Sequence, residues 1–80
     1  MKEQDIQRKR IKQLEAEGYY VLKLMKTNKN GIPDILALKP GADVLFSEIK
    51  NKKGKVSKLQ QYRIEELQGY GFRSEIYRGE

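Results

Sequence analysis

The chain has 80 residues, the size of one small domain near the lower limit at which a hydrophobic core suffices for stability. It contains neither cysteine nor histidine, which excludes disulfides, thiolate zinc sites, histidine-based catalytic triads and histidine-ligated metals. Any metal must therefore be held by oxygen ligands, a set that favours Mg²⁺ or Mn²⁺. The formal net charge of +6 predicts attraction to polyanions, with a solvated basic surface as the less favoured explanation.

No apolar run approaches the ~20 residues that a membrane span requires. Met1 leads into a charged stretch instead of a signal peptide. We therefore expect a soluble, cytoplasmic protein. Repeats, linkers and low-complexity tracts are absent from the sequence, so residues 1–80 are interpreted as a single domain.

Apolar periodicity and turn residues predict six elements in the order αβββαβ, which is an α/β pattern. In chain order they are a helix over 2–17 ended by Gly18, strands over 19–25, 35–38 and 43–50, a helix over 57–70 ended by Gly71, and a last strand over 72–77. On the first predicted helix, Glu3 and Gln7 share one stripe with Leu14. Both are polar although they point inward, which a functional site at that end of the helix would explain.

Two short motifs carry the strongest chemical signal. Asp34 follows Pro33 at the start of the second predicted strand, since proline can only open a strand. Glu48 and Lys50 form the only Glu-x-Lys of the chain and emerge on one face of the third strand. Each motif alone has an ordinary explanation, a Pro-Asp turn or a solvent-exposed ion pair. Together they place two carboxylates and a lysine on adjacent strands. This is the arrangement that metal-dependent cleavage of a phosphodiester bond requires.

The second predicted helix adds Gln60, which shares a stripe with Ile64 and Leu67 and should face the sheet. Ser57-x-x-Gln60 also fits a capping box, and the two interpretations can coexist. A lysine-rich loop precedes this helix and would hold phosphates beside the site, unless it is only a solvated charge run. The candidate phosphate-binding residues are Lys52, Lys53, Lys55 and Lys58.

These residues resemble the motifs of the VRR-NUC family, which belongs to the PD-(D/E)XK nuclease superfamily. The matching segments are Glu3-x-x-Ile6-Gln7, Gly31-Ile32-Pro33-Asp34, Glu48-Ile49-Lys50 and Ser57-x-x-Gln60. The resemblance spans nearly the whole chain and is to a minimal, stand-alone, virus-type member. It implies a restriction-endonuclease-like αβββαβ core, with a small mixed sheet flanked by two helices. It also implies that the protein is located in the cytoplasm of a bacterium or of a virus-infected host cell.

The resemblance further implies roles for individual residues. Asp34 and Glu48 would be the metal ligands, together with the backbone carbonyl of Ile49. Lys50 would orient or activate the attacking water and stabilise the developing negative charge. Gln60 would support the lysine or the water. From the first helix, Glu3 would join the acidic cluster.

The sequence therefore predicts an endonuclease that uses Mg²⁺ or Mn²⁺ to hydrolyse DNA phosphodiester bonds. Small stand-alone relatives are similar to Holliday-junction resolvases, which cut branched DNA. Such a junction has two symmetric strands to cut, and this symmetry favours a homodimer. Two alternatives remain open. One is a general or nicking DNA nuclease without junction preference, and the other is a non-catalytic basic module that binds nucleic acid and needs only the lysines.

Overall fold

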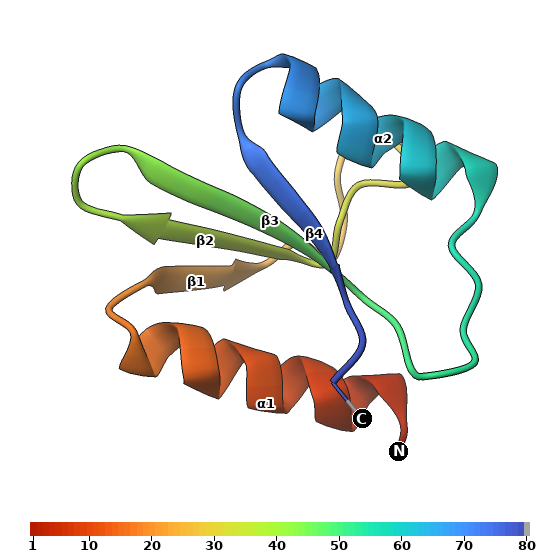
Figure 1. Cartoon of the computed structure of the whole chain (residues 1–80), viewed down its shortest axis with the longest axis horizontal. Helices are drawn as coiled ribbons and strands as arrows, with labels where there is room; N and C mark the ends of the chain where they lie inside the picture. The colour runs from red at the N-terminus through yellow and green to blue at the C-terminus, as the bar shows by residue number, and fades with distance from the viewer. Residues whose placement is uncertain (80) are drawn as a thin grey trace.

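The structure is a computed structural model that describes residues 1–79 and has three layers, with one helix on each face of a mixed four-stranded sheet (Figure 1). The elements are α1 (Glu3–Ala16), β1 (Tyr20–Lys23), β2 (Ile35–Lys39), β3 (Asp43–Ile49), α2 (Lys58–Gly69) and β4 (Arg73–Tyr77). The strand order is β1-β2-β3-β4, antiparallel up to β3 and parallel between β3 and β4. This arrangement confirms the predicted α/β class and its restriction-endonuclease-like αβββαβ core.

The main core lies between α1 and one face of the sheet. Ile6 and Leu14 are eight residues apart, on the same side of the helix, and both are buried. They pack on apolar side chains that alternate along the two central strands, namely Ile35, Ala37, Leu45 and Ile49. Helix α2 lies over β4 on the opposite face of the sheet, where Ile64 is buried (Figure 1). No helix within residues 1–79 has the length and apolar character needed to cross a bilayer.

Strand β1 ends at Lys23, two residues earlier than predicted, because its partner strand begins only at Ile35. The Leu24 N–H still donates to the Asp34 carbonyl at 2.8 Å. Pro33 comes directly before Asp34, and without an N–H it cannot donate to a continuing ladder. The hydrogen bonding of the sheet therefore stops beside Asp34, and the chain between the two strands leaves the sheet there.

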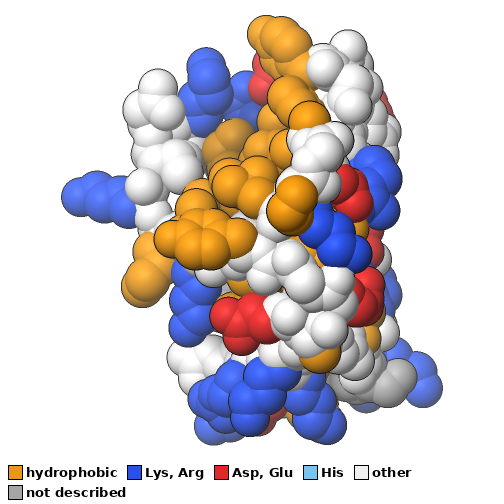
Figure 2. Space-filling model, turned by 90° about the vertical axis from the view of Figure 1, so that its left-hand side faces the viewer, with side chains coloured by type: hydrophobic (Ala, Val, Ile, Leu, Met, Phe, Trp, Pro, Cys, Tyr) orange, Lys and Arg blue, Asp and Glu red, His pale blue; other side chains and the backbone are white. Residues whose placement is uncertain are grey.

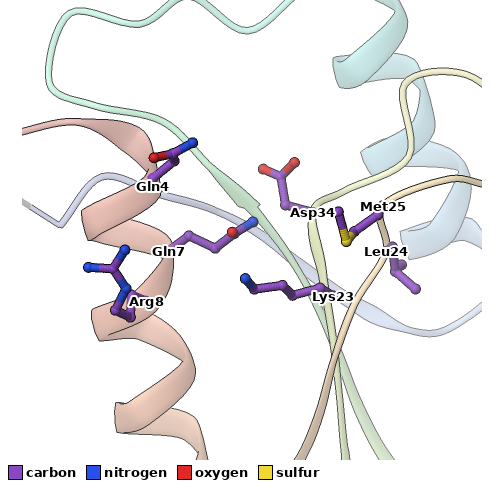
Figure 3. Close-up of a pocket in the computed structure, with 7 residues that line it drawn as sticks. All are labelled: Gln4, Gln7, Arg8, Lys23, Leu24, Met25 and Asp34. Carbon is purple, nitrogen blue, oxygen red and sulfur yellow. The ribbon is translucent and has the colours of Figure 1, made fainter.

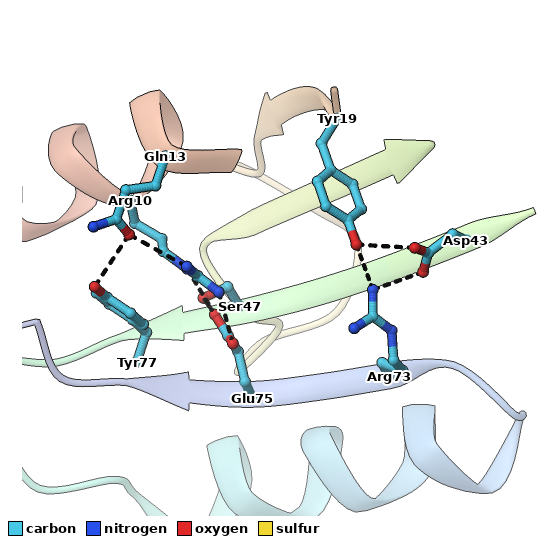
Figure 4. A network of polar contacts seen from close by, with 8 residues as sticks. All are labelled: Arg10, Gln13, Tyr19, Asp43, Ser47, Arg73, Glu75 and Tyr77. Carbon is cyan, nitrogen blue, oxygen red and sulfur yellow. Dashed lines mark hydrogen bonds and ion pairs between the residues drawn. The ribbon is translucent and has the colours of Figure 1, made fainter. Parts of the chain in front are cut away.

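A partly buried ion pair joins α1 to the last strand (Figure 4). The Arg10 guanidinium donates to both oxygens of the Glu75 carboxylate at 3.0 Å and lies 4.3 Å from the centre of the Tyr77 ring. The hydroxyl of Ser47, which is fully buried, donates to the same carboxylate at 2.6 Å. Two parallel N–H···O bonds are the strongest form of an arginine–carboxylate contact. This pairing accounts for an arginine on the inward side of α1.

A second polar cluster closes the end of the sheet farthest from Asp34 (Figure 4). The Tyr19 hydroxyl donates to the Asp43 carboxylate at 2.9 Å, and the Arg73 guanidinium donates to both groups at 2.6 Å. The hydrogen bonds from Tyr19 and Arg73 hold the pKa of Asp43 below its usual value. These residues therefore fix the β2–β3 turn against β4 and lie apart from the acidic residues at the other end.

Replacing Arg10 by alanine should lower the free energy of unfolding by about 2 kcal/mol, because the half-buried Glu75 carboxylate loses its charged partner. Arg8→Ala is the matched control, since the ion pair of Arg8 with Asp5 is exposed and should contribute less than about 0.5 kcal/mol. Urea unfolding followed by circular dichroism measures both values. Equal losses in the two variants would show that burial of the Arg10–Glu75 ion pair adds nothing to the free energy of unfolding.

Candidate active site

The strand register places Asp34 opposite Glu48. Ile35 pairs with Ser47 in the antiparallel β2–β3 ladder, so the next step along both strands pairs Asp34 with Glu48. Directly opposed residues of such a ladder lie on the same face, with β-carbons roughly 5 Å apart. The two carboxylates thus meet at one end of the sheet, as their predicted positions on adjacent strands require.

The Asp34 side chain is fixed by the backbone at the end of β3. Its carboxylate accepts the Ile49 N–H at 2.8 Å. The ladder ends at the Ile35–Ser47 pair, and continuing its register would set Ile49 opposite Pro33, which has no N–H to offer the Ile49 carbonyl. That carbonyl is therefore left without a ladder donor next to the two carboxylates. The two carboxylates and this carbonyl are therefore the oxygen atoms that the end of the β2–β3 pair offers to a metal ion.

Glu48 is the most unusual residue of the site, because it is a carboxylate that is only 2% exposed. One of its oxygens, Oε2, accepts a hydrogen bond from the Gln60 side chain at 3.3 Å and lies 3.9 Å from the Lys50 Nζ. The other, Oε1, is buried and has no hydrogen-bond partner among residues 1–79. Burial, followed by repulsion from Asp34, raises the pKa of Glu48 to about 8, although Lys50 acts in the opposite direction.

A buried, unpartnered carboxylate oxygen beside a second carboxylate is unfavourable unless a cation or a proton neutralises it. A divalent cation would give Oε1 of Glu48 its missing partner and offset the repulsion from Asp34. An oxygen-only donor set suits Mg²⁺ or Mn²⁺. Within residues 1–79, no three acidic side chains are placed together to bind a metal. The ligands that this site offers such an ion are therefore two carboxylates and one carbonyl.

Gln60 fulfils both roles that its sequence pattern suggested. Its backbone N–H donates to the Ser57 hydroxyl and its side-chain carbonyl accepts the Ser57 N–H, each at 3.0 Å, which completes the capping box of α2. The capping bond occupies the side-chain oxygen and leaves the Nε2 group free to donate to Glu48. The helix start and the site therefore share one side chain.

Glu3 lies at the first turn of α1 with an exposed side chain, and its carboxylate accepts the Asn51 N–H at 3.4 Å. Together with Asp34 and Ile49 it lines a small cavity of about 180 Å³. Gln7 borders the same cavity. The two polar residues on the inward side of α1 therefore face the candidate site, which explains their position among apolar neighbours.

The loop between β3 and α2 carries the candidate phosphate-binding side chains. All four of them, Lys52, Lys53, Lys55 and Lys58, are exposed. Arg78 fixes this loop, because its guanidinium donates to the carbonyls of Asn51 at 2.8 Å and Gly54 at 2.7 Å. Sequence reasoning missed Arg78, since contacts to backbone carbonyls leave no motif in the side chains. The basic loop is thus held next to Lys50 by a residue beyond β4.

The comparisons agree with the geometry of the site. The chain matches the VRR-NUC domain family over residues 2–80, essentially its whole length. No curated protein and no solved structure gives a significant match. VRR-NUC nucleases form part of the PD-(D/E)XK superfamily, whose restriction-endonuclease-like core is the fold described above. Because the match covers the strands and helices that carry every candidate site residue, the chain belongs to the VRR-NUC family of nucleases.

Proposed function

We propose that this nuclease is a metal-dependent endonuclease that hydrolyses DNA phosphodiester bonds. The observation that carries the proposal is the buried, unpartnered Glu48 oxygen opposite Asp34. These two carboxylates and the Ile49 carbonyl would hold Mg²⁺ or Mn²⁺. When bound, the ion polarises the scissile phosphate and makes water a better nucleophile.

Lys50 is the residue best placed to act on the reacting groups. It follows Glu48 on the same face of the chain, and its side chain is only 14% exposed. An ammonium in so confined a place can orient the attacking water and stabilise the negative charge that develops on the phosphate oxygens. Gln60 keeps the Glu48 carboxylate in position, so that it remains opposite Asp34.

Asp34→Ala or Glu48→Ala should reduce cleavage by at least about 10³-fold, while Lys50→Ala should slow it by about 10²-fold or more. The assay compares labelled four-way junction, linear duplex and single-stranded DNA, each with EDTA, Mg²⁺ or Mn²⁺. DNA binding should persist in the carboxylate variants. Glu65→Ala, an exposed carboxylate on α2, is the control and should cut normally.

Three outcomes would count against parts of this assignment. Undiminished cutting by the Asp34 and Glu48 variants would overturn the active site. Equal cutting of every DNA form would retain the active site but remove junction selectivity. Binding without cutting under any metal would favour the non-catalytic module.

The metal-free protein should lose stability as the pH rises. Folding raises the pKa of Glu48 from an ordinary 4.5 to about 8, so the folded state holds a proton that the unfolded state has released. The contribution of Glu48 to stability is then fully present below pH 4.5, declines as the pH rises from there, and is lost once the pH has passed through 8. No histidine titrates in this interval. Glu48→Gln should remove most of this decline and stabilise the metal-free protein above pH 8 by at least ~1 kcal/mol.

Thermal unfolding in EDTA between pH 5 and pH 9 tests this expectation. Added Mg²⁺ should restore the melting temperature of the natural chain at high pH and have little effect on Glu48→Gln, because the variant lacks the negative ligand. Parallel pH profiles for the two proteins would show that Glu48 does not carry a proton in the folded state.

We further propose that the substrate is branched DNA and that the protein acts as a homodimer. An open apolar surface supports the dimer. Tyr20 and Leu22 of β1 are 68% and 39% exposed, on the face of the sheet opposite α1. The open sheet face consists of Tyr20, Leu22, Leu36, Leu38, Val44 and Phe46. Helix α2 lies over β4 instead, and Figure 2 shows hydrophobic side chains gathered on this side of the molecule.

The chemistry of the open sheet face favours a second copy of the chain as its occupant. None of its six side chains is charged, so it offers nothing to a polyanion. Two copies of a chain with a net charge of +6 repel each other, and the repulsion is weakest when the surfaces in contact are both neutral. A two-fold axis through this face would bury identical apolar side chains against each other and would pair two active sites, as a symmetric junction requires.

Leu22→Glu should convert the dimer into a monomer, because a charge is introduced at the centre of the apolar contact. Sedimentation velocity measures the change. Paired cuts at a four-way junction should fall together with the dimer. Tyr62→Glu is the control, since Tyr62 is 56% exposed on α2 and outside this face. A natural chain that remains monomeric at micromolar concentration, alone and on junction DNA, would contradict the dimer.

A further inference from the structure

A cleft of about 510 Å³ opens on the side of Asp34 away from the lysine-rich loop (Figure 3). Its lining residues come from α1, from the end of β1 and from the segment that follows, and are Gln4, Gln7, Arg8, Lys23, Leu24, Met25 and Asp34. We refer to this space as the α1–β1 cleft. Its volume lies within the range of roughly 300–1,000 Å³ that is typical of ligand sites. Asp34, a candidate metal ligand, forms part of its wall, so the cleft and the active site are continuous.

Three polar side chains of the α1–β1 cleft are not used by the fold. Within residues 1–79, the side chains of Gln4, Gln7 and Lys23 make no hydrogen bond or ion pair with the protein. In Figure 3 the Gln7 amide and the Lys23 ammonium point toward each other across the cleft. Carboxamides on the inward side of a helix usually find protein partners. Their free donors and acceptors are therefore available to a ligand.

The chemistry of the lining fits a nucleotide within a strand. Lys23 supplies a cation for a phosphate, and the Gln7 carboxamide can both donate to and accept from a base edge or a sugar. Arg8 adds a second positive charge, which Asp5 only partly offsets through an exposed contact of 3.3 Å. If the scissile phosphate is held at Asp34, the neighbouring nucleotide of the same strand reaches this cleft. The cations of the lysine-rich loop lie on the other side of that phosphate.

We propose that the α1–β1 cleft binds the nucleotide next to the scissile phosphate, with Lys23 on its phosphate and Gln7 on its base or sugar. The proposal rests on the nuclease function above and gives the substrate strand a path across the site. The strand is bound on both sides of the bond that is cut, by the lysine-rich loop on one side and by the α1–β1 cleft on the other. Lys23 is thus a substrate-binding residue outside every motif, and Gln7, which ends the Glu3-x-x-Ile6-Gln7 segment, gains a role in substrate binding.

The first test measures binding of fluorescently labelled duplex and four-way junction DNA by anisotropy in EDTA, where no cleavage occurs. Lys23→Ala should weaken binding several-fold and reduce the slope of log K against log salt by about one, because one phosphate contact is lost. Gln7→Ala should weaken binding about fivefold and leave the slope unchanged, since no charge is removed. Lys12→Ala and Gln61→Ala, exposed residues of the same types outside the cleft, are the controls and should bind as the natural chain does.

The second test locates the phosphate that Lys23 contacts. A series of substrates, each with one uncharged methylphosphonate near the scissile bond, is bound to Asp34→Ala with and without Lys23→Ala. At one phosphate adjacent to the scissile bond, the methylphosphonate should weaken Asp34→Ala but not the double variant, because the contact is already gone. If the methylphosphonate and Lys23→Ala have additive effects on the binding free energy at every phosphate, the assignment of Lys23 is overturned.

The two proposals fail separately. If the natural chain cuts DNA while Lys23→Ala and Gln7→Ala match it in affinity, salt slope and KM, the cleft assignment is wrong and the nuclease stands. If the natural chain binds DNA without cutting it, and the variants still change affinity and salt slope as expected, the cleft binds nucleic acid and the nuclease proposal falls. Circular dichroism verifies that each variant is folded.

Discussion

The hydrogen bond from the Ile49 N–H to the Asp34 carboxylate fixes Asp34 at the end of β3, and the rest of the site depends on it. A backbone donor at the end of β3 fixes the orientation of Asp34. The regular register of β2 and β3, continued by one residue, sets Glu48 opposite Asp34. Pro33 adds to this by offering no N–H to the Ile49 carbonyl, so the end of the antiparallel pair presents a cluster of oxygen atoms to a ligand.

Both helices contribute to this cluster from opposite faces of the sheet. Helix α2 begins with the capping box that directs Gln60 toward Glu48, and α1 begins with Glu3, which accepts the N–H of Asn51. The cluster itself is unfavourable without a cation, because it buries one carboxylate beside another. The fold offsets such a cost elsewhere, for example where Arg10 and Ser47 satisfy the Glu75 carboxylate. Proteins commonly keep unfavourable interactions at a functional site and offset them with favourable interactions elsewhere in the fold.

Local patterns were sufficient to predict much of this structure. The order and class of the elements followed from periodicity and from turn residues such as Pro33, and their bounds differ by at most two residues from those predicted. The meeting of Asp34 and Glu48 followed from their placement on two predicted strands joined by a short turn. The single sizeable difference, the early end of β1, has its cause in the partner strand and not in residues 24–25 themselves.

Tertiary features had no such local signal. The contact of Arg78 with the carbonyls of the lysine-rich loop depends on where the chain passes after β4. The open sheet face exists because α2 lies over β4 and leaves β1 and β2 uncovered. The α1–β1 cleft depends on the separation between a helix and a strand, which no spacing in the sequence specifies. Lys23 could therefore be recognised as exposed and basic, but not as a neighbour of Asp34.

The β2–β3 pair carries both carboxylates on one hairpin, which the short turn between Lys39 and Asp43 closes. Closing so short a stretch of chain costs little conformational entropy, and such contacts form early in folding. The lysine-rich loop and residues 24–32, which follow β1 and end before Pro33, lie outside this hairpin. Insertions or deletions in those two segments can therefore change which DNA surfaces the protein contacts without moving Asp34 relative to Glu48. Under the roles proposed above, substrate preference and cleavage chemistry would be encoded by separate stretches of chain.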